Sequence, residues 1–387
     1  MNSAVVIDCC RTPIGRSHPD KGFFRDVRGD DLAAAVLRDL VRRTGIDPQC
    51  IEDVVLGCTQ QRQEQGLNIA RMASLLAGLP TSTAGTTVNR LCGSGLQAVQ
   101  QAAHAIVAGG EEVQIVGGVE HMHHLPMDAD VDFNPKLALV TSKAALHMGY
   151  VAEFLAQSHG ISRRQQDEFA LASHQRAARA TAEGAFQPEI VPLLGVDPAG
   201  DPVRVTTDQG IRADASLEAL AALPPAFLPE VGSVTAGNSS PRNDGAAALL
   251  MTSERRAREL GLRPLVRIRA TAVAGVDPCL MGTGPVPAVR KALRRAGLTL
   301  DQIGLVELNE AFAAQVLACR QLLDLDPDRL NVRGGALALG HPLGASGARI
   351  ATTLIRTMVD REVRFGLATM CVGLGQGIAV VLERCDA

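Results

Sequence analysis

Apolar residues recur at helical spacing in two stretches, "AVLRDLVRRTGIDPQCIEDVVLG" (35–57) and "PAVRKALRRAGLTLDQIGLVELN" (287–309). Each stretch predicts an amphipathic helix that stops at a glycine, Gly45 or Gly297, followed by a short connection and an apolar strand. The second stretch begins 252 residues after the first (287 minus 35), and the two align without a gap. This pattern indicates an internal repeat.

The same offset continues further along the chain. "CGSGLQAVQQAAHAIV" (92–107) falls on "GASGARIATTLIRTMV" (344–359), so that Ser94 and Ser346 each open a predicted helix. The strands that follow, 112–118 and 362–370, align after a two-residue slip. Strands that alternate with helices predict layered sheets with helices on their faces.

The repeat divides the chain into three parts. We predict a first α/β half over 1–120 plus about 245–250, and a second half over 251–387. The intervening segment, 121–244, contains a helix that Ser162 caps and several stretches rich in proline and glycine. Such a segment is expected to cover one face of the molecule as a binding loop region.

Composition narrows the possible functions. Of 387 residues, 46% are hydrophobic and 20% charged, and the net charge is −3, which does not favour nucleic acid or a membrane surface as a partner. We find no secretory signal and no apolar stretch of the roughly 18 residues that span a bilayer. Nine cysteines without disulfide spacing favour a reducing, cytoplasmic location.

Three histidines, His121, His123 and His124, lie within four residues in "EHMHHLPM". A transition-metal site usually needs further ligands from elsewhere in the chain, and the sequence offers none in a suitable pattern. We therefore predict no metal.

Cys92 lies at a predicted strand-to-helix junction and is followed by Gly93, Ser94 and Gly95. A helix N-terminus lowers the pKa of a cysteine, and the thiolate is the reactive form, so Cys92 is a candidate nucleophile. The alternative is that Cys92 is a buried packing residue.

Two further candidates follow strands in the second half. Asn309, in "ELNEAFAAQ", is a possible reacting-site residue or simply a helix cap. His341 is flanked by glycines and precedes Pro342, so a structural role is also open. The repeat places His341 on Asn89, close to Cys92, and equivalent residues of a duplicated fold often meet at its axis.

A second thiol, Cys371, ends a strand before Gly373, Gly375 and Gly377. This run lacks the GxGxxG pattern and leads into another strand, which excludes a dinucleotide fingerprint. Two thiols, a histidine, an asparagine and glycine amides together suit acyl transfer, although spacing alone does not bring them together.

Five segments, in order along the whole chain, resemble the motifs of the thiolase family: "NRLCGSGLQA", "TAGNSSPRNDGAAA", "NEAFA", "GGALALGHPLGASGAR" and "CVGLGQG". The resemblance implies the thiolase fold, an α/β fold of two duplicated βαβαβαββ halves in α/β/α/β/α layers with an inserted loop domain. It also implies an acyltransferase.

The resemblance assigns roles to the catalytic candidates. Cys92 would take the acyl group as a thioester after activation by His341, and Cys371 would act as acid and base. His341, with a water held by Asn309, would form one oxyanion hole. The backbone N–H groups of Cys92 and Gly373 would form the other.

Four further positions match the family's substrate contacts. Ser240 would lie near the pantetheine arm of coenzyme A, His147 and Met148 would line the substrate tunnel, and Arg212 would bind the nucleotide end. Coenzyme A is a substrate in this reaction, and no cofactor is implied.

"GGVEHMHHLPM", "DFNP" and "EQGLNIAR" resemble the degradative branch, 3-ketoacyl-CoA thiolases of bacterial fatty-acid oxidation. That branch implies a homodimer in a heterotetramer with a hydratase/3-hydroxyacyl-CoA dehydrogenase α subunit. Alternatives are a biosynthetic acetyl-CoA acetyltransferase and a non-catalytic, thiolase-like lipid-binding protein. A ketoacyl synthase normally lacks the second thiol. Arg333 and Pro224 depart from the family pattern outside the catalytic motifs.

Overall fold

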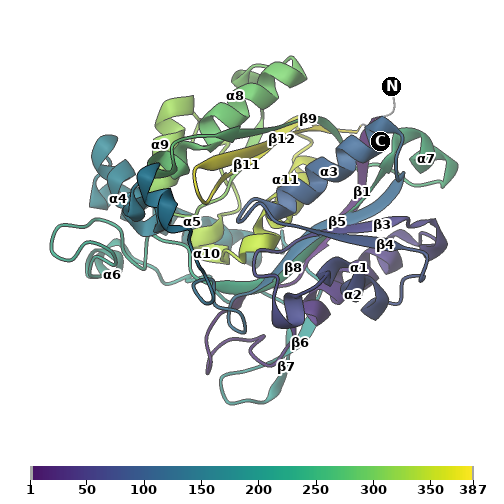
Figure 1. Cartoon of the computed structure of the whole chain (residues 1–387), viewed down its shortest axis with the longest axis horizontal. Helices are drawn as coiled ribbons and strands as arrows, with labels where there is room; N and C mark the ends of the chain where they lie inside the picture. Colours follow the sequence, from purple (N-terminus) through teal and green to yellow (C-terminus); the bar gives the residue numbers. More distant parts are fainter. Residues whose placement is uncertain (1–2, 386–387) are drawn as a thin grey trace.

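The computed structural model describes residues 3–385 as two α/β halves joined by a segment on one side (Figure 1). The first half follows the predicted order βαβαβαββ. Its elements are β1 (Ala4–Arg11), α1 (Gly29–Thr44), β3 (Asp53–Gly57), α2 (Ile69–Leu76), β4 (Ala84–Val88), α3 (Ser94–Ala108), β5 (Val113–His121) and β8 (Asn243–Ser253). A short strand, β2 (Gly15–Arg16), also pairs with β8.

The second half repeats this order with one strand reduced. Its elements are β9 (Val266–Gly275), α8 (Pro285–Ala296), β10 (Leu305–Leu308), α9 (Ala313–Leu323), α10 (Ala336–Leu339), α11 (Leu343–Asp360), β11 (Phe365–Val372) and β12 (Gln376–Arg384). The third strand survives as a single bridge between Val306 and Leu330. Asn331 ends it, because its φ is +46° and its side chain bonds both the N–H and the carbonyl of Leu308.

The 252-residue offset holds more closely than the sequence indicated. β5 begins at Val113 and β11 at Phe365, so the expected two-residue slip is wrong. Both predicted glycine stops are confirmed, since Gly45 and Gly297 cap α1 and α8 with positive φ. Ser94 does open α3, whereas α11 begins three residues before Ser346, directly after Pro342.

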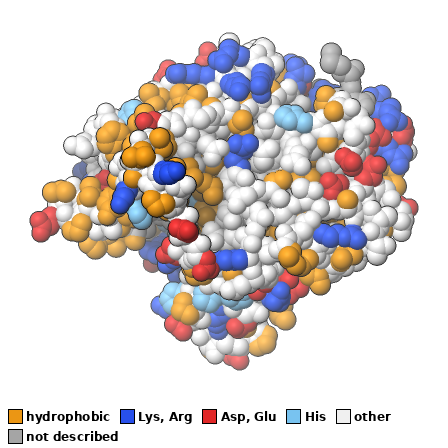
Figure 2. Space-filling view, in the orientation of Figure 1, with side chains coloured by type: hydrophobic (Ala, Val, Ile, Leu, Met, Phe, Trp, Pro, Cys, Tyr) orange, Lys and Arg blue, Asp and Glu red, His pale blue; other side chains and the backbone are white. Residues whose placement is uncertain are grey.

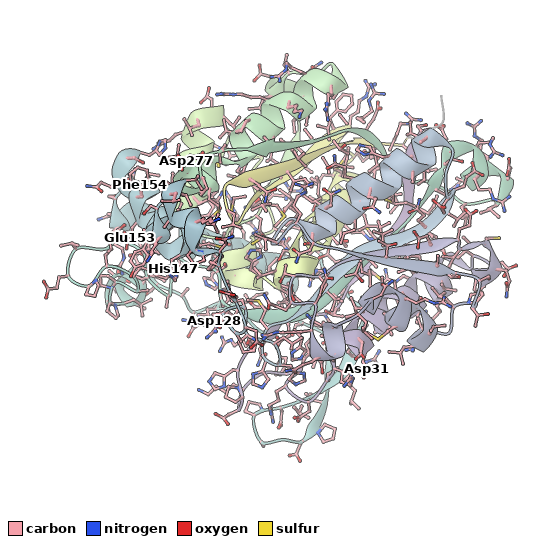
Figure 3. The ribbon with its side chains drawn as sticks, in the orientation of Figure 1. Asp31, Asp128, His147, Glu153, Phe154 and Asp277 are labelled. Carbon is pink, nitrogen blue, oxygen red and sulfur yellow. The ribbon has the colours of Figure 1, made fainter. Side chains whose placement is uncertain are left out.

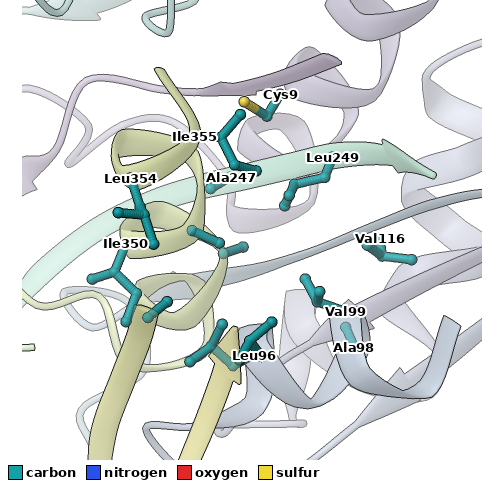
Figure 4. Close-up of a cluster of buried hydrophobic side chains, with 14 of the residues drawn as sticks. Cys9, Leu96, Ala98, Val99, Val116, Ala247, Leu249, Ile350, Leu354 and Ile355 are labelled. Carbon is teal, nitrogen blue, oxygen red and sulfur yellow. The ribbon is translucent and has the colours of Figure 1, made fainter. Parts of the chain in front are cut away.

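All main strands form one mixed sheet in the order β10-β11-β12-β9-β1-β8-β5-β3-β4, folded around the two central helices α3 and α11. α1 and α2 cover the outer face of the first half, and α8 and α9 that of the second. The central helices and the inner strand faces share one apolar core that includes Leu96, Val99 and Ile350 (Figure 4).

The central helices approach closely at equivalent glycines. A Cβ on Gly95 would lie 2.5 Å from the Ala348 nitrogen, and a Cβ on Gly347 would lie 2.2 Å from the Leu96 nitrogen. Gly95 and Gly347 are related by the repeat offset. The two halves therefore meet, at backbone contact, along the axis of the duplication.

The segment between β5 and β8 lies mostly beside the second half (Figure 1). It contains α4 (Met148–Ser158), α5 (Arg163–Ala182), β6 (Leu193–Val196), β7 (Pro202–Val205) and α6 (Leu217–Ala221); α7 (Glu254–Glu259) follows β8. The predicted cap is confirmed: Ser162 and Gln165 form a capping box at the start of α5. Among residues 3–385, no helix is long and apolar enough to cross a membrane.

Candidate active site

Cys92 lies in a tight connection between β4 and α3. Leu91 directly before it has a φ of +45°, a conformation that costs a non-glycine residue free energy and concentrates at functional sites. Two side chains hold this turn: the side-chain amide oxygen of Asn89 accepts the Leu91 N–H at 2.8 Å, and the Ser94 hydroxyl accepts the Arg90 N–H at 2.9 Å. The nucleophile candidate therefore stands on a constrained loop.

The Cys92 thiol is protonated in the resting molecule. The side chain is 4% exposed, and this burial raises the pKa to about 11 although the N–H groups of Gly373 and of Cys92 itself favour the thiolate. The lowered pKa expected from the helix N-terminus is wrong, because desolvation of the sulfur outweighs the helix field. The N–H groups of Cys92 and Gly373, one from each half, therefore both face this sulfur.

His341 precedes α11 and is 5% exposed. Its N–H donates to the Asn243 side-chain oxygen at 3.0 Å, and its Nδ1 lies 2.6 Å from the Ser346 hydroxyl. Burial, with a further contribution from the Arg349 charge, lowers the pKa of the imidazole to about 3. His341 is therefore neutral at physiological pH, so one of its ring nitrogens carries a lone pair.

Asn309 follows β10 and lies against His341. Its N–H donates to the Thr369 carbonyl, and its side-chain nitrogen lies 3.4 Å from each ring nitrogen of His341. The alternative of a helix cap is wrong, because α9 begins only at Ala313. The structure thus brings together two of the predicted site residues.

Cys371 lies near the end of β11, and the predicted following strand is confirmed as β12. It is 2% exposed and packs in an apolar cluster with Met148, Phe227 and Phe312. Burial first, and then the charge of a Cys92 thiolate, raise the pKa of the Cys371 thiol well above its usual value. The charge state of Cys92 therefore affects the pKa of Cys371.

The substrate-contact candidates occupy two places. Met148 reaches the cluster around Cys371, while His147 is exposed at the start of α4 (Figure 3). The His147 ring is edge-on to Tyr150. Ser240 lies against the Asn-Glu-Ala segment, since its N–H donates to the Ala311 carbonyl at 3.0 Å.

Arg212 lines a separate cleft of about 290 Å³ together with Arg16, His174 and Ser239. The Arg212 N–H donates to His174 Nδ1, and burial followed by the two arginine charges lowers the pKa of His174 to about 4. The Arg212 charge also lowers the pKa of Arg16, after burial. The Ser239 hydroxyl is buried without a hydrogen-bond partner. This cleft presents two cations and a free hydroxyl to an anion.

A possible metal site is formed by Glu64, His121 and His124, whose ligand-type atoms lie within 4.8 Å of one another. Hydrogen bonds, however, already occupy the ring nitrogens of the two histidines. His124 has Glu64 Oε1 at 3.0 Å from Nδ1 and the Arg25 carbonyl at 2.7 Å from Nε2, so both nitrogens must donate. These bonds outweigh burial and raise the pKa of His124. His121 bonds the Phe24 carbonyl through Nε2 and accepts the His124 N–H at Nδ1. This geometry is that of an ion pair rather than a metal site.

The two departures from the family pattern lie away from the thiols. Arg333 is 4% exposed, donates to the Ala185 carbonyl and pairs with Asp360, so it ties the end of α5 to the end of α11. Pro224 is exposed, next to Leu223 on the rim of the Arg212 cleft.

Residues 4–255 match the thiolase N-terminal domain family, and residues 262–384 match the thiolase C-terminal domain family. The chain belongs to the thiolase family. This thiolase is 55% identical to proteins named 3-ketoacyl-CoA thiolase from Photobacterium profundum and Photorhabdus laumondii subsp. laumondii. The alignments cover 99% and 100% of the chain and 100% of each relative.

A solved structure of the Bacillus anthracis acetyl-CoA acetyltransferase superimposes on this thiolase with a TM-score of 0.91 at 40% identity. The superposition covers 100% of this chain and 99% of the other. The predicted fold class is thereby confirmed, and the thiolase is an acyltransferase.

Two residues that hold the site were missed by sequence reasoning. Ser346 was interpreted as a helix opener, although the repeat pairs it with Ser94, whose hydroxyl also organises the loop before its helix. Asn243 lies in the "TAGNSSPRNDGAAA" segment and binds the His341 N–H and, through its amide nitrogen, the Gly15 carbonyl. The sequence signal for Asn243 is an amide side chain at the start of an apolar strand, where a polar group must find a hydrogen-bond partner.

Proposed function

We propose that this thiolase is the degradative enzyme of fatty-acid β-oxidation, which cleaves 3-ketoacyl-CoA with coenzyme A to acetyl-CoA and a shortened acyl-CoA. The observation that carries the proposal is the contact of the Gly373 N–H with the Cys92 sulfur, two residues after Cys371. Two buried thiols from opposite halves, Cys92 and Cys371, thus share one site, which supports the proposal. The 55% identity to 3-ketoacyl-CoA thiolases supports the degradative branch.

In the first half-reaction, the Cys92 sulfur attacks the C3 carbonyl while its proton moves to Nε2 of His341. The carbonyl oxygen becomes an anion, which the preorganised N–H groups of Cys92 and Gly373 stabilise. The C2–C3 bond then breaks, and the acyl group remains on Cys92 as a thioester. The electron pair of the broken C2–C3 bond stays with C2, so acetyl-CoA leaves as its enolate. The enolate then takes the proton of the Cys371 thiol.

In the second half-reaction, the Cys371 thiolate takes the proton of incoming coenzyme A. The coenzyme A sulfur attacks the thioester carbon, and the Cys92 sulfur leaves and recovers its proton from His341. The raised pKa of Cys371 makes its thiolate a strong base toward incoming coenzyme A, and the thiol still protonates the enolate because an enolate is the stronger base. A water held between Asn309 and His341 would stabilise the enolate oxygen.

The two substrate-contact regions fit the two ends of the substrate. The apolar cluster of Met148, Phe227 and Phe312 beside Cys371 would receive apolar parts of the substrate, with His147 at its entrance. Ser240 would contact the pantetheine arm, and the Arg212 cleft would bind the phosphates. We propose that the reaction needs no metal or resident cofactor, because these side chains supply its nucleophile, acid and base.

We propose that two copies form a homodimer. β4 is the outermost strand of the first half, and its far edge has no paired strand among residues 3–385. Nearby, Leu67 is 94% exposed. Unpaired strand edges of this kind tend to pair with another chain. A second copy at this edge would cover both β4 and the Leu67 side chain.

We also propose the α-subunit complex and a cytoplasmic location. Large apolar side chains are exposed on the inserted segment, including Leu139 at 83%, Val140 at 79% and Val231 at 83%. Figure 2 shows apolar side chains gathered over the region of α4 and α6. Coexpression with a hydratase/dehydrogenase α subunit should yield a stable heterotetramer; a dimer without affinity for that subunit contradicts this partner.

Turnover of acetoacetyl-CoA and of a longer substrate, 3-ketodecanoyl-CoA, tests the branch. The degradative enzyme should have the higher kcat/KM with the longer substrate. A strong preference for acetoacetyl-CoA would instead identify the alternative, a biosynthetic acetyl-CoA acetyltransferase.

A further inference from the structure

Glu120 is a fully buried carboxylate in β5. Five N–H and O–H donors from three separate segments converge on it, and the Cys58 S–H is a sixth, weaker donor at 3.9 Å. Its Oε2 accepts the N–H groups of Thr59 at 3.0 Å and of Gly344 at 2.9 Å, together with the Thr59 hydroxyl. Its Oε1 accepts the Gln60 N–H at 3.1 Å and the Gln65 amide at 2.9 Å. Such a set stabilises an ionised carboxylate in the interior.

One side of this network leads to the nucleophile. The Thr59 carbonyl accepts the side-chain N–H of Asn89 at 3.1 Å, and the oxygen of the same amide accepts the Leu91 N–H at 2.8 Å. Leu91 is the residue with positive φ directly before Cys92. Three hydrogen bonds, through Thr59 and Asn89, thus connect Glu120 to the strained turn that carries the thiol.

The other side leads to the base. Gly344 lies in the first turn of α11, three residues after His341 and two before Ser346. The backbone of Gly344 is packed tightly against the first half, because a Cβ on Gly344 would lie 2.5 Å from the Val119 carbonyl and 2.9 Å from the Cys58 Cα. The carboxylate therefore joins the Cys92 loop of one half to the His341 loop of the other.

We propose that Glu120 is a positioning residue that sets the placement of Cys92 relative to His341. Its negative charge lies close enough to raise the pKa of Cys92, after the larger effect of burial. The resting pair is then a thiol and a neutral imidazole, and the proton moves only during attack. This inference rests on the proposed roles of Cys92 and His341.

The variant Glu120→Gln separates this role from a merely structural one. Its amide nitrogen would face N–H donors, so the loops should separate and kcat for thiolysis should fall about 10- to 100-fold with KM within about twofold. The separation should also expose the buried Cys92 sulfur, so alkylation of Cys92 by iodoacetamide should become several-fold faster at pH 7–10. The tryptic peptide 91–136 contains Cys92 as its one cysteine, so mass spectrometry reports this thiol alone.

Two further variants complete the experiment. Glu120→Asp keeps the charge but shortens the reach, so kcat should fall while the pH dependence of alkylation stays that of the wild type. Asp39→Asn removes a carboxylate of 8% exposure on the outer helix α1 and should change neither readout. Wild-type kcat in either folded Glu120 variant, or unchanged alkylation in Glu120→Gln, would overturn the proposal. Retained activity of Cys92→Ala would instead refute the proposed nucleophile.

Discussion

The imidazole Nδ1 of His341 lies 2.6 Å from the Ser346 hydroxyl oxygen, which lies 2.8 Å from the Pro342 carbonyl oxygen. A carbonyl only accepts, so the hydroxyl gives its one proton to Pro342 and accepts from His341. Nδ1 therefore carries the imidazole proton, and Nε2 keeps its lone pair. The hydroxyl thus selects the tautomer that is able to act as a base through Nε2.

Loss of this hydroxyl should impair the chemical step. In Ser346→Ala, His341 loses the acceptor that orients its ring, so kcat should fall about tenfold or more while KM stays close to wild type. Steady-state kinetics with saturating coenzyme A measure both constants. Thr357→Ala is a matched control, because Thr357 on the same helix also bonds the carbonyl four residues back. Equal losses in the two variants would contradict an orienting role.

Removal of the Cys92 sulfur should abolish turnover without loss of the fold. In Cys92→Ala no thioester forms, so thiolysis of 3-ketoacyl-CoA should drop by about 10³-fold or more, and acyl-CoA should leave no covalent adduct in intact-protein mass spectrometry. Cys50→Ala, at a half-buried cysteine near Arg256, should keep both properties. Substantial turnover by Cys92→Ala would exclude this sulfur as the nucleophile.

Arg212 should favour thiol substrates that carry the phosphates of coenzyme A over thiols without phosphates. In Arg212→Gln, the KM for coenzyme A should rise about tenfold, since one charge-assisted contact is lost, while kinetics with pantetheine as the thiol acceptor should not change. The control is Arg164→Gln, because Arg164 forms an exposed pair with Glu168 on α5. An equal loss with both acceptors would place the phosphates elsewhere.

Acid should destabilise the protein through its buried neutral histidines. Burial, and then the His124 charge, lower the pKa of His121 to about 4, whereas the unfolded chain binds this proton near pH 6.5. Between these values only the unfolded state is protonated, so stability is full above pH 6.5 and falls as the pH drops toward 4. Titration of His121 alone should lower the free energy of unfolding by about 3 kcal/mol over this pH range.

Urea unfolding at pH 7 and pH 4.5 measures this effect. His121→Gln should have a smaller difference in unfolding free energy between the two pH values than wild type. His159→Gln, at the end of α4, should retain the wild-type difference. A wild-type difference in His121→Gln would show that other groups govern acid unfolding.

Local patterns predicted the repeat, the glycine stops at Gly45 and Gly297, and the Ser162 cap, because each depends on neighbouring residues. The reduced third strand of the second half was not predictable, since the side chain of Asn331 reaches back to a strand 23 residues earlier. The motifs indicated Cys92, Asn309 and His341. They did not indicate the protonation state of Cys92, because burial of its sulfur depends on packing from the other half.

The glycine contact between α3 and α11 has a consequence for partly assembled molecules. Gly95 and Gly347 bring the helix that follows Cys92 against the helix that follows His341. A molecule in which the halves have separated loses the base, the second thiol and the Gly373 donor together. Two fragments divided near residues 254–265 should therefore be inert when separate and become active on mixing. Catalytic activity of this chain therefore reports that both halves have assembled.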